Sequence, residues 1–187
     1  IVTGVRRVLF RSGLLLTLAA TLPLSALAET EQQQQQQQQI AAQVLPYQAK
    51  PRVFVLTDIG NEPDDQMSLT RFLLYSNEMN IEGLVATTST WQREKVHPDM
   101  IELVLGHYAE VQPNLLKHDP AYPAASLLKT RIAAGQASYG MQATGEGKGT
   151  AGSALLVSAI EKSTHKAQPL YINLWGGANT LAQALID

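Results

Sequence analysis

Residues 53–69, VFVLTDIGNEPDDQMSL, join an apolar run to three carboxylates and then to a second apolar pattern. The run from Val53 to Leu56 is short, β-branched and aromatic, and it lies between Pro51 and Gly60, so it predicts a buried strand of a parallel sheet. Beyond it the apolar residues recur at helical spacing, at Met67, Leu69, Phe72, Leu73 and Leu74. A buried strand, an acidic turn and a helix restrict the chain to folds that alternate these two kinds of element.

The same alternation continues along the chain. Apolar patterns and turn residues predict strands at 53–57, 82–87 and 170–175, and helices at 64–77, 96–109, 124–134, 153–163 and 178–187. Strands that alternate with helices are typical of an α/β fold. We therefore expect an open, mostly parallel, doubly wound sheet of the Rossmann-like kind.

The first 49 residues differ in composition from the rest. Residues 13–28 form an apolar segment that ends in a small-x-small pattern, which is typical of a cleaved signal peptide and too short for a membrane span. Residues 29–49 contain eight consecutive glutamines, Gln32 to Gln39, and predict a disordered linker. Residues 1–12 match the translation of a sequencing adaptor and are interpreted as an assembly artefact. The folded domain is then expected at 50–187.

Charge and cysteine content narrow the partners and the compartment. The formal net charge is -2, which does not favour nucleic acid or an anionic membrane surface as a partner. There is no cysteine, so neither a lipid attachment residue nor a disulfide framework is present. With the signal peptide, this predicts a soluble periplasmic or extracellular protein, and the net charge suits a neutral small molecule or a glycan as its ligand.

Three carboxylates follow the first predicted strand, at Asp58, Asp64 and Asp65. Ligands of open α/β sheets bind beyond the carboxyl ends of the strands, where these residues fall. Close carboxylates repel one another unless a cation compensates them, and calcium, which accepts about 6 to 8 oxygen ligands, suits an irregular set. The alternative is structural, because acidic residues at helix N-termini also cap free N–H groups.

The pattern Asp58-x-Gly60 followed by Asp64-Asp65 resembles the amino-terminal fingerprint of the inosine/uridine-preferring nucleoside hydrolases. More closely, the stretch from Pro51 to Asp187 resembles the nucleoside hydrolase-like domain of bacterial cellulose-binding proteins. Residues 81–88 and 171–185 carry the likeness further, through a second strand and a later strand that leads through a Gly-Gly turn into a helix.

The resemblance implies roles for individual residues. Asp58 is expected to bind Ca²⁺ and to deprotonate the attacking water, Asp64 to hold sugar hydroxyls, and Asp65 to bind Ca²⁺. The main-chain carbonyl of Trp175, just before the Gly-Gly turn, is expected to complete this side of the metal shell. The family domain continues to a distal Asp and a His, so we expect a domain truncated at its C-terminus.

Two departures from the hydrolase pattern bear on function. Leu56 replaces the first acid of the D-x-D motif, and Asp64 lies two residues further from Gly60 than in the hydrolases. Leu56 also excludes a phosphatase of the haloacid dehalogenase type, which needs an aspartyl nucleophile there. Residues 87–91, TTSTW, replace a substrate-contacting Asn, and Trp91 is interpreted either as a stacking surface for a sugar or base or as a packing residue.

The longest polar loop, residues 138–152, is rich in glycine. Loops of this length are functional or disordered in compact domains, so it is interpreted either as a lid that brings Glu146 or Lys148 to the substrate or as a mobile surface loop. The four histidines lack metal-ligand spacing, which argues against zinc.

These patterns lead to two hypotheses of function. The first is a secreted, calcium-dependent enzyme that hydrolyses an N-glycosidic or related glycosyl bond in a small-molecule nucleoside or a glycan, polysaccharides included, as the resemblance implies. The second is a carbohydrate-binding, cellulose-binding protein that retains the hydrolase fold without turnover. The residues Asp58, Asp64 and Asp65 favour the enzyme, whereas Leu56 and the Thr90-Trp91 segment favour the binding protein.

Overall fold

The computed structural model describes residues 50–162 and 168–187, together with Gln36. Four strands form one parallel sheet in the order β3-β2-β1-β4. The strands are β1 (Arg52–Thr57), β2 (Asn80–Ala86), β3 (Ile132–Ala134) and β4 (Leu170–Leu174). The helices are α2 (Pro63–Leu74), α3 (Pro98–Leu115), α4 (Ala125–Lys129), α5 (Ala151–Glu161) and α6 (Asn179–Ile186), with 3-10 turns η1 (Ser76–Glu78) and η2 (Met141–Ala143).

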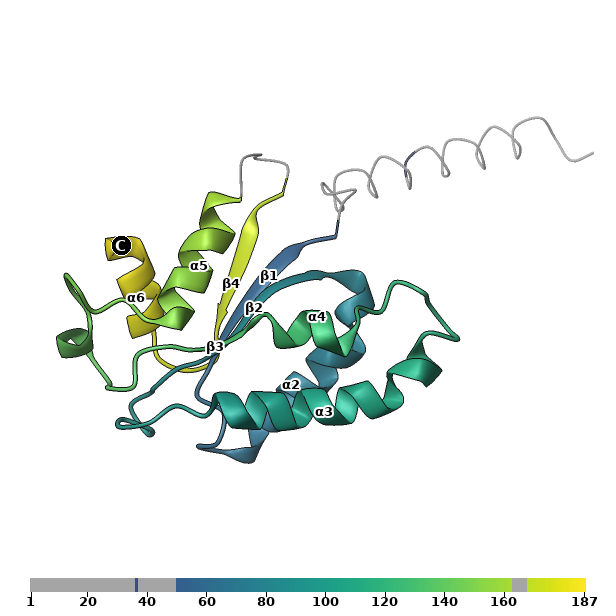
Figure 1. Cartoon of the computed structure of the whole chain (residues 1–187), viewed down its shortest axis with the longest axis horizontal. Coiled ribbons are helices and arrows are strands. Elements are labelled where there is room, and N and C mark those ends of the chain that lie inside the picture. The colour runs from purple at the N-terminus through teal and green to yellow at the C-terminus, as the bar shows by residue number, and fades with distance from the viewer. Residues whose placement is uncertain (1–35, 37–49, 163–167) are drawn as a thin grey trace, which may run out of the picture. The chain divides into compact units, whose positions relative to one another are not determined.

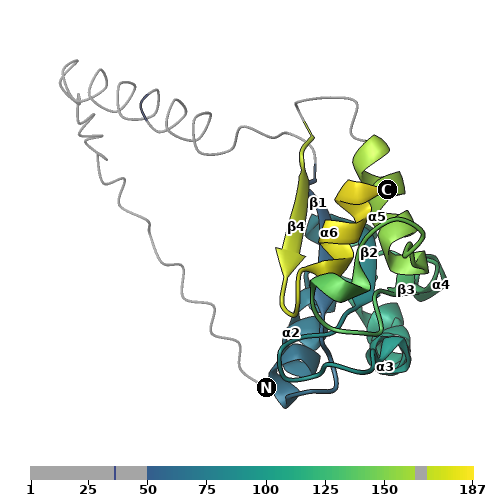
Figure 2. The same ribbon diagram turned by 90° about the vertical axis from the view of Figure 1, so that its left-hand side faces the viewer.

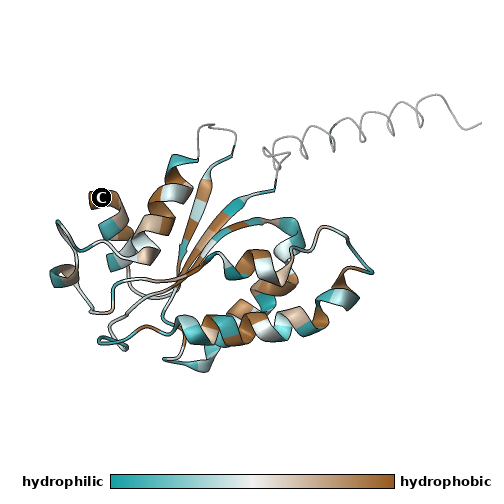
Figure 3. Ribbon diagram, in the orientation of Figure 1, coloured by the Kyte–Doolittle hydropathy of each residue, from teal (hydrophilic) through white to brown (hydrophobic). Residues whose placement is uncertain are grey.

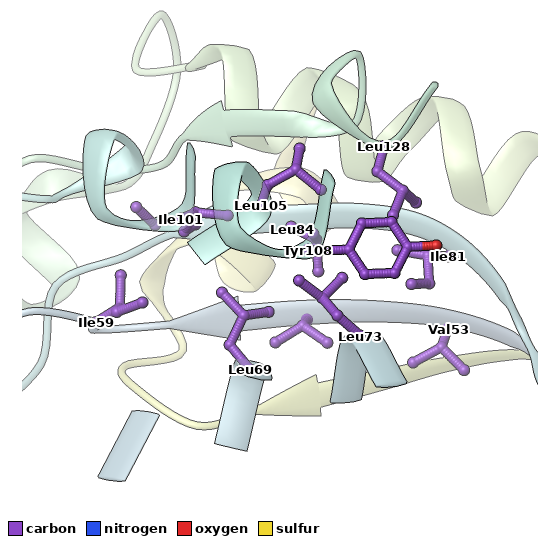
Figure 4. Close-up of a cluster of buried hydrophobic side chains, with 12 residues drawn as sticks. Val53, Ile59, Leu69, Leu73, Ile81, Leu84, Ile101, Leu105, Tyr108 and Leu128 are labelled. Carbon is purple, nitrogen blue, oxygen red and sulfur yellow. The ribbon is translucent and has the colours of Figure 1, made fainter. Parts of the chain in front are cut away.

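The helices cover both faces of the sheet (Figure 1), so the expected doubly wound α/β fold is confirmed. On one face, α2, α3 and α4 pack against alternate residues of β1 and β2, where Leu69, Leu73, Leu84 and Leu105 point toward one another (Figure 4). On the other face, Phe54 and Leu56 of β1 pack against α5 and α6. Figure 3 shows apolar and polar residues alternating along α3, as expected for a helix with one face on the core.

The chain order creates a switch point between β1 and β4. From β1 the chain moves outward through β2 to β3, and after α5 it returns to pair β4 with the opposite side of β1. Figure 2 shows β4 at the outer edge of the sheet. Such a reversal leaves a crevice at the carboxyl ends of the two strands, where ligands of this fold class bind. In this molecule that crevice lies beside Asp58.

The predicted helix 124–134 is wrong in its second half. Helix α4 ends at Lys129, and Ile132 to Ala134 form β3. The pairing with β2 decides the outcome, because the N–H of Leu84 donates to the carbonyl of Arg131 at 2.8 Å and the register continues from Leu84 to Ile132. Alanine-rich sequence favours a helix locally, but pairing with a neighbouring strand overrides that preference.

Other element ends move by one to six residues. Helix α3 runs from Pro98 to Leu115, beyond the expected 96–109, and includes Pro113. Helix α2 ends at Leu74 rather than at 77, because the chain turns there into η1.

The proposed artefact at 1–12, the signal peptide at 13–28 and the linker at 29–49 lie outside the described residues, apart from Gln36. Among the residues that the structure describes, no helix is both long and apolar enough to cross a membrane.

Candidate functional site

A cavity of about 220 Å³ opens at the carboxyl edge of the sheet, and we call it the acidic cavity. Backbone hydrogen bonds bring three strand ends together there: Thr87 N–H donates to Thr57 O at 2.8 Å, and Trp175 N–H donates to Leu56 O at 2.8 Å. The lining contains four carboxylates and two tryptophans, namely Asp58, Glu62, Asp64, Asp65, Trp91 and Trp175. Of the six candidate residues from the sequence analysis, only Glu146 is absent from this lining.

Asp58 lies directly after β1 and is only 9% exposed. Its place depends on two glycines. Gly60 adopts a φ of +99°, which other residues rarely adopt, and so turns the chain away from the strand. Gly176 approaches Asp58 so closely that a Cβ atom there would lie 2.8 Å from the Asp58 nitrogen and 3.0 Å from its Oδ1. The buried side chain of Gln92 donates to the Asp58 carbonyl at 3.2 Å.

Asp65 lies in the first turn of α2 and faces β1. Its Oδ2 accepts a hydrogen bond of 2.5 Å from the hydroxyl of Thr57, whose oxygen in turn accepts from Ile59 N–H at 3.1 Å. Burial raises the pKa of the Asp65 carboxyl from 3.8 to about 6, with further contributions from Asp58 and Asp64, whereas the Thr57 hydrogen bond lowers it. The raised pKa thus reflects first the burial of this carboxyl and then the two neighbouring carboxyls.

The other two acids of the cavity are more exposed. Asp64 is exposed next to Pro63, which begins α2. The N-cap residue, Glu62, makes no side-chain capping hydrogen bond. The carboxylates at this helix start therefore face the cavity, and the hydrogen bond of Asp65 goes to a strand rather than to a free helix N–H.

The two tryptophans differ in their surroundings. Trp91 is 79% exposed, so it does not pack into the core, and its backbone N–H donates to the Ser89 hydroxyl at 3.1 Å. Trp175 is half-buried and meets the ring of Phe72 edge-on, with ring centroids 6.0 Å apart. Trp91 therefore presents a free aromatic face beside the carboxylates, and Trp175 forms a packed wall.

The donor set suits a hard divalent cation in its chemistry, because carboxylate and amide oxygens line the cavity and no thiol or imidazole does. Asp58 and Asp65 are the two least exposed carboxylates in this lining. Within the described ranges, however, no three His, Cys, Asp or Glu side chains converge at metal-binding distance. The donor chemistry is compatible with Ca²⁺, and calcium binding at this site stays a prediction. The Trp175 carbonyl as a ligand stays a prediction.

Glu146 does not line the acidic cavity. It is exposed in the glycine-rich loop, and that loop is fixed to α6. The Gln183 side chain, fully buried, accepts from Gly145 N–H at 2.8 Å and donates to Gly145 O at 3.0 Å, and Asn179 donates to Ser138 O at 2.8 Å. These contacts hold the loop on α6. A substrate role for Glu146 stays a prediction.

Sequence reasoning missed Thr57, Asn61, Glu62 and Gln92. Asn61 and Glu62 line the acidic cavity, and Thr57 and Gln92 hold Asp65 and Asp58 in place. The signal for Asn61 and Glu62 was present in the sequence, because they lie between Gly60 and Asp64 in the same turn. The contact of Gln92 with Asp58 joins residues 34 positions apart and has no local signal.

Comparison with known proteins places these features in a family. The family model described as "Cellulose-binding Sde182, nucleoside hydrolase-like domain" matches residues 52–187. A nucleoside hydrolase-related hypothetical protein from Saccharophagus degradans, associated with carbohydrate metabolism, has a solved structure that matches with 37% identity and a TM-score of 0.70. The match covers 73% of this chain and 33% of that protein. No curated protein sequence matches.

The expected resemblance is therefore confirmed over the folded part of the chain. The family match covers the sheet and helices that build the acidic cavity, from Arg52 to Asp187. This chain belongs to the Sde182 family of nucleoside hydrolase-like domains.

Proposed function

We propose that the acidic cavity binds a sugar together with a calcium ion, and that it hydrolyses an N-glycosidic or related glycosyl bond. The observation that carries this proposal is the pairing of the buried Asp58 with the half-buried Asp65, two carboxylates that share one cavity with the exposed Asp64 and Trp91. A carboxyl in a cleft whose pKa is raised by burial, as that of Asp65 is, is typical of a functional site.

Each residue has a separate task in this proposal. Asp58 and Asp65 would hold the calcium, which would lower the pKa of a water molecule bound to it. Asp58 accepts a proton from the water that attacks the anomeric carbon, while the glycosyl bond breaks and the leaving group takes the bonding electrons. Asp64 accepts hydrogen bonds from sugar hydroxyls, and the Trp91 ring covers one face of the sugar.

A second candidate is binding of a glycan without turnover. Two observations favour it. Trp91 is 79% exposed and lines the cavity, so its ring is accessible for stacking on a sugar. Leu56 packs in the core with α5 and α6 and supplies no carboxylate to the site. The family description as cellulose-binding agrees with this candidate.

One pair of assays separates the candidates. The purified protein is tested with calcium for release of free base from a panel of nucleosides, and in parallel for retention on cellulose. Calcium-dependent release that is lost in Asp58→Asn, but kept in Asp99→Asn, supports the enzyme, because Asp99 is an exposed acid on α3. Retention on cellulose without release supports the binding protein. If the protein neither releases base nor is retained on cellulose, both candidates are refuted.

We also propose that the protein is exported to the periplasm or the medium, on the basis of residues 13–28. Cell fractionation and N-terminal sequencing test this, with a mature terminus expected at Glu29. An uncleaved cytoplasmic protein would contradict it.

A further inference from the structure

A second cavity, of about 450 Å³, adjoins the acidic cavity. It is lined by Gly60, Asn61 and the run from Trp91 to Lys95, and we call it the 91–95 cavity. Trp91 and Asn61 line both cavities, so they form the boundary between the two.

We propose that the 91–95 cavity is a second sugar subsite, so that the ligand is a neutral glycan of at least two sugar units that crosses Trp91. This inference rests on the proposed function, because it takes the first sugar to lie in the acidic cavity.

The sizes of the two cavities support an extended ligand. Small-molecule sites measure about 300 to 1,000 Å³. The acidic cavity, at about 220 Å³, falls below this range, whereas the 91–95 cavity, at about 450 Å³, falls within it. A ligand that filled the acidic cavity alone would leave the larger cavity unused.

The backbone of Trp91 is held in place, and its side chain is accessible to a ligand. The Ser89 hydroxyl accepts from the backbone N–H groups of both Trp91 and Gln92, at 3.1 Å each. Gln92 is buried and donates to the Asp58 carbonyl. The strand end that carries Asp58 is thus connected to the segment that carries Trp91. An exposed indole on this fixed backbone provides an apolar face for a sugar ring, and with two side-chain torsions it loses little conformational entropy on binding.

Arg93 is also fixed before any ligand binds. Its Nε donates to the Thr90 carbonyl at 3.0 Å, and its guanidinium carbon lies 4.9 Å from the centre of the Tyr139 ring. The Tyr139 N–H donates to the Arg93 carbonyl at 2.9 Å. Because a guanidinium carries five N–H donors, most of them remain available for hydroxyl oxygens.

The charges favour a neutral glycan over an anionic ligand. Arg93 and Lys95 supply donors and Glu94 supplies an acceptor, which matches hydroxyl groups that both donate and accept. A phosphate-bearing ligand that crossed Trp91 would meet the four carboxylates of the acidic cavity, which repel it.

The test is calorimetric titration of the purified protein, in calcium, with glucose, cellobiose, cellotriose, cellotetraose and inosine. We expect affinity to rise about tenfold from glucose to cellobiose, the size of one well-packed aromatic contact. Trp91→Ala should lose about this factor for the oligosaccharides, while Trp91→Phe retains most of it. The control is Tyr75→Ala, since Tyr75 is an exposed aromatic residue that lines neither cavity.

Arg93→Ala isolates the second subsite. It should remove the gain from glucose to cellobiose and leave the affinity for glucose unchanged, and thermal unfolding checks that the variant is folded. Equal affinity for glucose and cellobiose in the unmodified protein, or an equal loss for both in Arg93→Ala, would overturn the second subsite and leave the proposed function standing. Absence of binding to every sugar and to inosine would overturn both.

Discussion

The hydroxyl of Thr57, the last residue of β1, donates a hydrogen bond of 2.5 Å to Oδ2 of Asp65 in the first turn of α2. This contact connects the first turn of α2 to the carboxyl end of β1. It also lowers the pKa of Asp65, against the burial and the neighbouring carboxyls that raise it.

Replacement of Thr57 by valine should therefore raise the Asp65 pKa above its present value of about 6. Thr57 is 1% exposed, so the loss also leaves the Ile59 N–H without its acceptor and should destabilise the fold by about 1 to 3 kcal/mol. Carboxyl chemical shifts followed through a pH titration measure the pKa. Thr57→Ser keeps the hydroxyl and is the control, and an unchanged pKa in Thr57→Val would contradict the role of this contact.

The raised pKa of Asp65 makes stability depend on pH. The folded carboxyl, with a pKa of about 6, holds its proton more tightly than the unfolded one at 3.8. The folded state therefore binds more protons between these values, and the free energy of unfolding falls as pH rises. The stabilising contribution is complete below pH 3.8 and is lost as pH passes 6.

Asp65→Asn removes this dependence in calcium-free buffer. The variant should gain stability relative to the unmodified protein as pH rises from 4 to 7. The gain is at most about 3 kcal/mol and is smaller where solvent screens the charges. Urea unfolding at pH 4, 5, 6 and 7 measures it. A stability difference that is constant with pH would show that Asp65 titrates alike in both states.

The strand, turn and helix around Asp58 could be predicted from the sequence because each signal there is local. The apolar run, Gly60 and the helical spacing after Pro63 all lie within a few residues of the element they specify. Strand β3 could not be predicted in this way, since Ile132 to Ala134 become a strand only through pairing with β2. The same limit applies to the site: its acids follow from position after a strand, whereas the contact of Gln92 with Asp58 depends on where a distant loop returns.

Calcium should bind to the purified protein and reverse the pH effect, because a cation near Asp65 favours the ionised carboxyl. We expect calcium to raise the thermal midpoint more at pH 7 than at pH 5, by mass action on the folded state. In calorimetric titration Asp65→Ala should lose most of the heat of binding. Glu110→Ala is the control, because Glu110 is an exposed acid on α3. Undiminished binding in Asp65→Ala would remove the metal-site proposal.

The close approach of Gly176 to Asp58 offers a test of position rather than charge. A methyl group at 176 would lie within 3.0 Å of three Asp58 atoms, so Gly176→Ala must displace the carboxylate or the turn after β4. Overpacking of this kind costs about 1 to 3 kcal/mol.

We expect Gly176→Ala to weaken calcium and sugar binding by more than its loss of stability explains, since the fold can persist with Asp58 out of place. Gly106→Ala is the matched control. Gly106 lies within α3, where an added methyl group meets nothing within 4 Å, so that variant should be more stable by about 0.5 to 1 kcal/mol and should bind normally. Calorimetry measures binding in both variants, and urea unfolding measures stability. Normal binding by a folded Gly176→Ala would mean that the position of Asp58 does not determine the site.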